Sequence, residues 1–341
     1  MKISELGEFG LIDLLAGMIK AAEGEETAAS RQPILGIGDD AAAWYGDDSI
    51  QLATVDALVQ DVHFTLDTTT WVDLGWKALA VNLSDIAAMG GLPRYALVSL
   101  ALPGQTEVEQ VTELYRGMIE LAQQFEVDII GGNMSSAPLV VINITVIGSA
   151  ESQDRLLTRS AARPGDKVAV TGYPGMAAAG LEMLSKHLSF EPAAVDKLKE
   201  AFLTPYPRVA EGRLLVEHGV RAAIDISDGL LSDLRHICKS SKVGARIEID
   251  RLPVHPAVRA TFEDRSLEFA LSGGEDYELL FTAGAEVIDK LKAYIYCPIT
   301  VIGEITAENS GEISLVDAKG NPVDQSRMGW GHFTSKGEVS N

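Results

Sequence analysis

Cysteines, long apolar runs and basic side chains are all scarce in this sequence, and each shortage excludes a class of protein. The 341 residues include only two cysteines, Cys238 and Cys297, and no C-x-x-C pair, which argues against thioredoxin-like chemistry and cysteine-rich zinc sites. Two isolated thiols are typical of a reduced, cytoplasmic protein. No apolar stretch reaches the roughly 18 residues of a membrane span, and acidic residues interrupt the first 17 residues, unlike a signal peptide. We therefore expect a cytoplasmic protein that has no membrane partner.

The shortage of basic side chains bears on possible ligands. Lys and Arg total 28 against 49 Asp and Glu, so the formal charge is 28 − 49 = −21. Binding to nucleic acid needs clustered basic side chains that displace counterions, so we expect no nucleic-acid partner. A chain this acidic needs metal cations to mediate any contact with phosphate ligands.

Several common catalytic motifs are also missing. The sequence contains no G-x-x-x-x-G-K-[ST] phosphate-binding loop, no H-E-x-x-H and no G-x-S-x-G. Gly36-Ile-Gly38 lacks the third glycine of a dinucleotide fingerprint and leads into two acids, Asp39 and Asp40. These absences exclude the most familiar nucleotide-binding, metalloprotease and serine-hydrolase signatures.

The order of apolar runs and turns predicts two α/β domains in tandem. The first half predicts strands at 50–55, 95–102, 127–130 and 139–148 and helices at 71–89 and 107–125. A turn-rich break at 161–166 follows, and we expect an N-terminal domain over 1–150 and a C-terminal domain over 151–341. The second half predicts strands at 167–171, 222–226, 246–249, 277–282 and 300–305 and helices at 175–187, 206–218 and 229–240.

Carboxylates at expected strand ends and loops are the most informative feature. They are Asp39, Asp40, Asp56, Asp61, Asp85, Asp225, Asp228, Glu275 and Asp276. Oxygen-only ligands suit Mg²⁺, which one or two carboxylates share with substrate phosphates. Any one of these residues is also explained as an ordinary turn Asp, but Asp56 and Asp225 each end an apolar strand, where structure alone requires no carboxylate. Glycine-rich corners at 131–136 and 271–276 are suited to the approach of backbone N–H groups to phosphate oxygens.

Eight motifs occur in one order that resembles the thiamine-monophosphate kinase family. They are GIGDDAA, TVDALVQDVHF, KALAVNLSDIAAMGG, IIGGNMSS, LTRSAARPGDKVAVTG, AIDISDGLLSDL, LSGGEDYEL and GWGHF. The family belongs to the superfamily of aminoimidazole ribonucleotide synthetase and selenophosphate synthetase. The resemblance extends over residues 5–333.

This resemblance implies a fold, an activity and partners. The implied fold is the two-domain, aminoimidazole ribonucleotide synthetase-like α/β fold. In it, the N-terminal domain binds ATP and Mg²⁺, its sheet forms a barrel across a homodimer, and the C-terminal α/β domain completes the active site. The implied enzyme phosphorylates thiamine monophosphate to thiamine diphosphate, with ATP as co-substrate and several Mg²⁺ ions. We expect direct in-line transfer, because the acceptor phosphate, with a second pKa of about 6, is already largely anionic at neutral pH and needs no strong base.

The resemblance also assigns roles to individual residues. The implied Mg²⁺ ligands are Asp40, Thr54, Val55, Asp56, Asp85, Asn133, Asp225 and Asp228, of which Asp40, Asp56, Asp85 and Asp225 are the implied catalytic residues. The implied ATP contacts are Tyr115, Gly132, Asn133, Arg159 and Ser227. The implied contacts to thiamine monophosphate are His63, Glu275 and Trp330.

Four of these residues have a structural alternative. Tyr115 lies in a helical pattern and could serve only in packing. His63 could be an ordinary strand-end histidine, and Arg159 an ordinary surface residue. Trp330 could fill a core, although an indole face also attracts the cationic thiazolium ring.

Two departures from the family pattern and two rival functions stay open. Asn133 stands where many relatives have Asp, so one metal site loses a charge, and Gly331 stands where Asp is common. We expect Asp39 either to be structural or to support the metal ligands without contacting the ion. The rivals are another ATP-dependent enzyme of the superfamily, similar to aminoimidazole ribonucleotide synthetase, and a non-catalytic nucleotide- or Mg²⁺-binding regulator.

Overall fold

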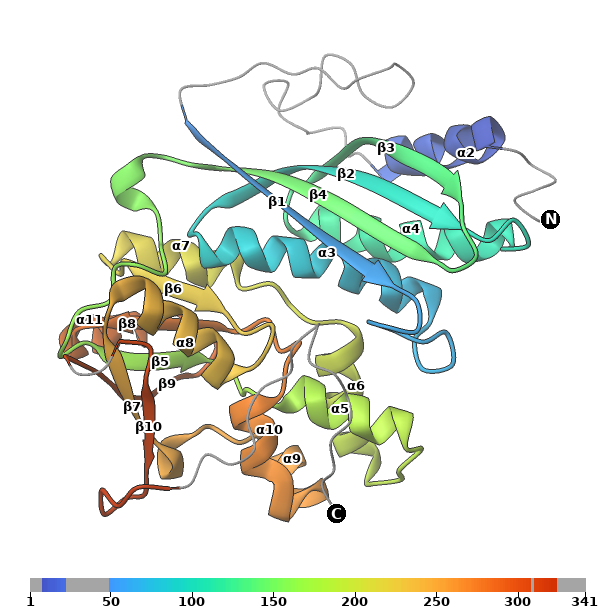
Figure 1. Ribbon diagram of the computed structural model, residues 1–341. Coiled ribbons are helices and arrows are strands. Elements are labelled where there is room, and N and C mark those ends of the chain that lie inside the picture. The colour runs from blue at the N-terminus through green and yellow to red at the C-terminus, as the bar shows by residue number, and fades with distance from the viewer. Residues whose placement is uncertain (1–7, 23–48, 308–309, 324–341) are drawn as a thin grey trace. The chain divides into compact units, whose positions relative to one another are not determined.

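The computed structural model describes residues 8–22, 49–307 and 310–323 (Figure 1). The chain forms two compact units, and the division is not contiguous. The first unit runs to Leu156 and takes in Leu203–Arg213, and the second comprises Leu157–Phe202 and the chain from Leu214 onward. In the described part of the chain, no helix combines the length and the apolar character that crossing a membrane requires.

The first unit contains a four-stranded mixed sheet in the order β1-β4-β2-β3. Its strands are β1 (Ile50–Val59), β2 (Leu92–Leu102), β3 (Asp128–Ser136) and β4 (Val141–Ala150). Strand β4 runs antiparallel to β1 and to β2, whereas β2 and β3 are parallel. Helices α3 (Trp71–Ala88) and α4 (Val108–Gln124) lie along one face of the sheet, and α2 (Glu8–Ala22) contacts α4 (Figure 1). The core of the unit lies between the sheet and these helices.

Alternation along β1 decides which side chains face the helices. Leu52 and Leu58 are buried with the helix-side core, and Thr54 and Asp56 between them share their face of the strand. Val55 lies on the opposite face and is 57% exposed. The strand therefore turns two polar side chains toward α3.

Two sequence-based expectations about this sheet were wrong. Strand β1 does not stop before Asp56, because its pairing with β4 continues through Val59 opposite Val141. Gly131 and Gly132 do not form a corner after β3 but lie inside it, where Gly132 is opposite Val98 of β2. A Cβ on Gly132 would lie 1.8 Å from the Val98 carbonyl oxygen, so this close backbone approach requires glycine.

The second unit contains a six-stranded sheet in the order β10-β7-β9-β5-β8-β6. Its strands are β5 (Lys167–Thr171), β6 (Ala222–Asp225), β7 (Gly244–Glu248), β8 (Leu279–Ala283), β9 (Ile299–Thr306) and β10 (Ile313–Val316). Neighbouring strands are antiparallel except for the parallel pair β10 and β7. This topology positions the ends of β6 and β5 on either side of the start of β8.

Helices of differing length accompany this sheet. They are α5 (Met176–Ser185), α6 (Pro192–Leu203), α7 (Val209–Glu217), α8 (Leu230–Ser241), α9 (Pro256–Thr261), α10 (Ser266–Ser272) and α11 (Ala285–Leu291), with 3₁₀ turns at Gln153–Arg155, Ile249–Arg251 and Glu263–Arg265. Helix α7 spans the division between the units at Arg213. Helix α8 packs against β6, β7 and β8.

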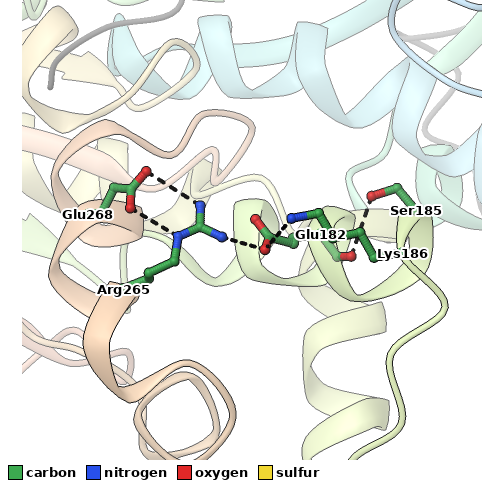
Figure 2. Close-up of polar contacts among 5 residues, drawn as sticks. All are labelled: Glu182, Ser185, Lys186, Arg265 and Glu268. Atoms are coloured by element: carbon green, nitrogen blue, oxygen red, sulfur yellow. Dashed lines mark hydrogen bonds and ion pairs between the residues drawn. The ribbon is translucent and has the colours of Figure 1, made fainter.

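An ion-pair network joins α5 to the segment that begins α10 (Figure 2). The Arg265 guanidinium donates to Glu182 of α5 and, over 3.0 Å, to Glu268 of α10. Lys186 donates to the same Glu182 carboxylate over 2.9 Å. The guanidinium also lies 4.7 Å from the centre of the Phe269 ring. Burial acts to raise the pKa of Glu182, but the bonds and charges of Lys186 and Arg265 outweigh it, and this pKa is lowered.

Candidate functional site

In the first unit, strand β1 and helix α3 bring four polar side chains together. This β1–α3 cluster consists of Thr54, Asp56, Asn82 and Asp85. The Thr54 hydroxyl donates to the Asp85 carboxylate over 2.5 Å. The Asp56 backbone N–H donates to the Asn82 side-chain oxygen over 3.1 Å. Residues two apart on a strand share a face, as do residues three apart on a helix, so the spacings 54/56 and 82/85 place all four at one contact.

Asn82 is the member of the cluster that sequence reasoning missed. Its side chain is fully buried and donates to the Ala78 carbonyl oxygen over 3.1 Å while accepting from Asp56. The amide therefore fixes the main chain of β1 to α3 at the residue that carries the candidate carboxylate. The sequence signal that could have identified it is an asparagine within an apolar helical segment, one turn before Asp85 in Asn82-Leu-Ser-Asp85.

The two carboxylates of the cluster disfavour each other's charge. Burial, followed by the charge of Asp85, raises the pKa of Asp56 to about 6. A cation between the carboxylates would remove this penalty. Two carboxylates and a hydroxyl form an oxygen-only donor set that fits Mg²⁺, which takes its remaining ligands from water and phosphate. In the part of the chain that the structure describes, no three His, Cys, Asp or Glu side chains form a complete metal site, so such an ion would depend on those additional oxygens.

Strand β3 is not brought to this cluster within one unit. Pairing across the sheet aligns Asp56 with Ile144, Ile144 with Val98, and Val98 with Gly132. Asp56 and Gly132 therefore lie at opposite edges, three strand spacings or about 14 Å apart. Gly132 and Asn133 are exposed on the β3 edge. A ligand atom cannot contact Asp56 and Asn133 of the same sheet directly.

His63 and Tyr115 have well-defined local surroundings. His63 Nδ1 accepts the Val59 backbone N–H over 3.0 Å, so a neutral ring carries its proton on Nε2. Tyr115 is 5% exposed and belongs to the core; burial raises the pKa of its hydroxyl. Its position supports the packing alternative, and its contact with ATP stays a prediction.

In the second unit, two buried carboxylates, Asp225 and Asp233, flank the loop between β6 and α8, and Asp233 holds its main chain. Asp225 ends β6 as predicted and is 3% exposed. Asp233, in the first turn of α8, accepts backbone N–H groups from Ser227, Asp228 and Gly229 over 3.1, 3.2 and 3.1 Å. Burial, and then the charge of Asp228, raises the pKa of Asp233 to about 7. Sequence reasoning missed Asp233, although an acid among leucines at the start of a helix is a recognisable signal.

A second loop, Gly274–Glu278, lies against the first. The Glu275 N–H donates to the Ser227 carbonyl oxygen over 2.7 Å, and the Tyr277 N–H donates to Ile226 over 2.9 Å. Glu275 and Tyr277 have φ values of +65° and +52°, an uncommon conformation for side chains other than glycine that is found preferentially at functional sites. The structure thus brings together three predicted residues, Ser227, Asp228 and Glu275.

Asp276 lies between those two strained residues and fixes them to α5. Its carboxylate accepts N–H groups from Gly175 over 2.6 Å and Ala177 over 3.0 Å at the start of the helix. Burial raises the pKa of Asp276 to about 8 despite these two hydrogen bonds. The N-terminus of α5 is thereby capped from within the chain.

Arg159 lies near the same loops, and some predicted residues cannot be placed. The pKa of His236 is lowered by burial and by Arg159, and Asp228 opposes this effect, so Arg159 and Asp228 are both within electrostatic range of one side chain. The remaining predicted residues, Asp40 and Trp330, lie outside the described residues, as do Asp39 and Gly331.

Comparison with known proteins identifies the family to which the chain belongs. Residues 38–150 match the family described as AIR synthase related protein, N-terminal domain, and residues 163–316 match its C-terminal domain. A thiamine-monophosphate kinase of Bacillus subtilis (strain 168) is 39% identical over 309 residues, which cover 88% of this chain and 93% of that protein. The chain belongs to the thiamine-monophosphate kinase family. The resemblance found in the motifs is therefore confirmed.

Two solved structures of thiamine-monophosphate kinase family members share the architecture. The thiamine-monophosphate kinase of Stenotrophomonas maltophilia K279a is 35% identical, with a TM-score of 0.80 over 88% of this chain and 95% of that one. The protein described as AaThiL complexed with AMPPCP and TMP is 32% identical, with a TM-score of 0.75 over 98% of this chain and 99% of that one. The expected two-domain, aminoimidazole ribonucleotide synthetase-like α/β fold is confirmed.

Proposed function

We propose that this chain transfers the γ-phosphoryl group of ATP to the phosphate of thiamine monophosphate, giving ADP and thiamine diphosphate. The observation that carries the proposal is the β1–α3 cluster, whose two carboxylates and hydroxyl suit a phosphate-bound cation, in a chain of this family. The complex of a relative with AMPPCP, an ATP analogue, and TMP supports the same pair of substrates.

The residues of the chain have separate tasks in this proposal. Thr54, Asp56 and Asp85 hold Mg²⁺ in the first unit, with the Val55 main chain and Asp40 contributing. In the second unit Asp225 and Asp228 hold Mg²⁺. Bound Mg²⁺ supplies charge neutralisation between the phosphates of the two substrates. Gly132, Arg159 and Ser227 contact ATP, while His63, Glu275 and Trp330 contact thiamine monophosphate.

We propose direct in-line transfer. The bond from the γ-phosphorus to the ADP oxygen breaks as a bond from an oxygen of the acceptor phosphate forms. Because that oxygen is already anionic at neutral pH, no side chain has to remove a proton from it. The tasks of the protein are then to orient the two substrates and to stabilise their charge.

The decisive experiment supplies purified protein with ATP, Mg²⁺ and a panel of acceptors. The panel contains thiamine, thiamine monophosphate and aminoimidazole precursors. We expect thiamine diphosphate from thiamine monophosphate alone, loss of turnover with chelator, and inversion at a chiral γ-thiophosphate. Turnover of an aminoimidazole precursor alone would establish the other superfamily enzyme, and nucleotide binding without turnover of any acceptor would establish the regulator.

We further propose that the chain works as a homodimer in which two copies complete one site. Asp56 and Asn133 lie at opposite edges of one sheet, so Asn133 reaches the β1–α3 cluster only from a second copy. The outward face of the sheet supports such pairing, since Ala53, Val55 and Ala57 are exposed on it and exposed apolar faces mark interaction surfaces.

Complementation between inactive variants tests this arrangement. Asp56→Asn and Asn133→Lys should each be inactive, whereas a mixed dimer contains one site without either substitution. An equimolar mixture that pairs at random, in which about half of the dimers are mixed, should therefore recover about a quarter of the wild-type activity. Asp67→Asn, an exposed loop substitution, is the control and should not change activity. Recovery that stays at zero while mixed dimers form would mean that each site uses residues of one copy.

A further inference from the structure

Three consecutive backbone N–H groups converge on a single carboxylate oxygen in the second unit. Ser227, Asp228 and Gly229 all donate to Asp233 Oδ2, at 3.1, 3.2 and 3.1 Å. Asp233 is 2% exposed, so water cannot replace it as the acceptor. The carboxylate therefore holds the main chain of the whole turn between β6 and α8.

The remaining contacts of the turn restrict its backbone to few other conformations. Gly229 has φ +123°, and a Cβ there would lie 2.9 Å from the Ser272 carbonyl oxygen, so the turn continues into α8 through a conformation reserved for glycine. On its other side, the Ser227 carbonyl oxygen accepts the Glu275 N–H. Asp233 is thus the only described acceptor for the three N–H groups, and it uses no side-chain atom of Ser227 or Asp228.

We propose that Asp233 is a positioning residue, which holds the Ser227–Gly229 turn in the conformation that presents Ser227 and Asp228 to the nucleotide and its cation. The part that concerns the nucleotide rests on the function proposed above, whereas the part that concerns the turn does not. The same arrangement has a second consequence. The N–H groups of Ser227, Asp228 and Gly229 are already used within the chain, so they do not bind phosphate oxygens directly, and recognition by the turn falls to its side chains.

The test compares Asp233→Ala and Asp233→Asn with a control, Asp317→Ala. Asp317 also holds a turn, by accepting the N–H groups of Lys319 and Asn321 over 2.8 Å each, but it follows β10, at the opposite edge of the same sheet from β6. Asparagine keeps one acceptor oxygen at position 233, so that variant serves as the conservative rescue and remains informative if the alanine variant does not fold.

Hydrogen–deuterium exchange of the peptide covering residues 226–230 is the readout that needs no activity. We expect exchange there to quicken about tenfold in Asp233→Ala, less in Asp233→Asn, and not at all in Asp317→Ala. The affinity for a non-hydrolysable ATP analogue, measured in the presence of Mg²⁺, should weaken about tenfold in Asp233→Ala. It should weaken less in Asp233→Asn and stay unchanged in Asp317→Ala. In turnover, KM for ATP should rise more than KM for thiamine monophosphate.

Three results would overturn the proposal. Unchanged exchange in both Asp233 variants would show that the turn is held by other contacts. Tighter nucleotide binding in Asp233→Ala would show that the carboxylate blocks an anion site instead of positioning the turn. A rise confined to KM for thiamine monophosphate would place the effect on the wrong substrate. If the wild-type protein turns over no thiamine monophosphate, the proposed function fails, while the exchange measurement still decides the role of Asp233.

Discussion

Replacing Asp276 by Asn should make the protein more stable than wild type at alkaline pH, and this gain in stability should shrink as the pH falls. The unfolded carboxyl has a pKa of 3.8, and burial raises the folded value to about 8. A carboxyl with a raised folded pKa favours the folded state fully below the unfolded pKa, and this contribution is lost as the pH rises through the folded pKa. The wild-type protein should therefore lose stability steadily between about pH 4 and pH 8.

The size of the effect follows from the shift and the contacts. Each pKa unit is worth about 1.4 kcal/mol, so a shift of this size sets an upper limit of about 5–6 kcal/mol, and we expect about 2–4 kcal/mol for a side chain that is only partly buried. Asparagine has one acceptor oxygen in place of two, and losing the bond from Gly175 or Ala177 costs about 1 kcal/mol. At pH 5 the unfolded carboxyl is already ionised, which costs the wild-type protein about 1.6 kcal/mol. Asp276→Asn should therefore be within about 1 kcal/mol of wild type at pH 5 and about 1–3 kcal/mol more stable at pH 9.

Urea unfolding followed by circular dichroism at pH 5, 7 and 9 measures this difference. The matched control is Asp317→Asn, since hydrogen bonds, first from Asn321, lower the pKa of Asp317 and confine its titration to acidic pH. The control should show the same difference from wild type at all three pH values. Parallel pH profiles for Asp276→Asn and wild type, with no larger gain in stability at pH 9 than at pH 5, would refute the assignment of a raised pKa to this carboxyl.

Three further substitutions have defined outcomes. Glu182→Gln should lower the free energy of unfolding by about 1–2 kcal/mol at pH 7, because Arg265 and Lys186 lose their shared anion. The pKa of Glu182 is lowered from 4.5 in the folded protein, so this loss should shrink as the pH falls below 4.5 and disappear once the folded carboxyl is protonated; a loss that persists there would contradict it. Gly132→Ala should lower the free energy of unfolding in urea by about 3 kcal/mol or more, since its Cβ would lie 1.8 Å from the Val98 carbonyl oxygen. The control, Gly104→Ala, places its Cβ where nothing lies within 4 Å and should be neutral. Equal effects of the two substitutions would be inconsistent with the close approach at Gly132. Thr54→Val keeps the side-chain shape but removes the donor to Asp85, and should reduce kcat/KM about tenfold at limiting Mg²⁺; an unchanged Mg²⁺ dependence would count against a role for Thr54 in the cluster.

Much of the first unit could be predicted from sequence periodicity. The expected helix at 71–89 corresponds to α3, and the expected strand at 95–102 lies within β2. Periodicity did not predict where strands end, because strand ends depend on the pairing partners that neighbouring strands offer. Strand β1 extends past Asp56 because β4 offers partners as far as Val141, and the glycines of β3 read as a turn although a close neighbouring strand requires them. Helices α2 and α6 went unpredicted, as did α9, α10 and α11, which are too short to show a helical period.

The candidate site divides in the same way. The motifs named Thr54, Asp56 and Asp85, and Ser227, Asp228 and Glu275, and the structure brings each set of three together within its own unit. Asn82 and Asp276 accept from main-chain N–H groups of residues distant in sequence, and Asp233 accepts from those of the turn that precedes its helix. Sequence spacing does not display such contacts. Assigning them required the fold.

The segment Leu203–Arg213 means that neither unit corresponds to one uninterrupted stretch of the gene. A fragment that ends at Leu156 would lose the Pro205 carbonyl that accepts the Trp76 indole N–H over 2.8 Å, and the Tyr206 ring that lies 5.4 Å from Phe125. It would also lose Val209 from the core. During synthesis, the first unit therefore stays unfinished until the ribosome has also made α6 of the second. Truncation after Leu156 should yield an unstable fragment. A mutation in Leu203–Arg213 should destabilise the first unit, although some fifty residues of the second unit separate this segment from the rest of the first.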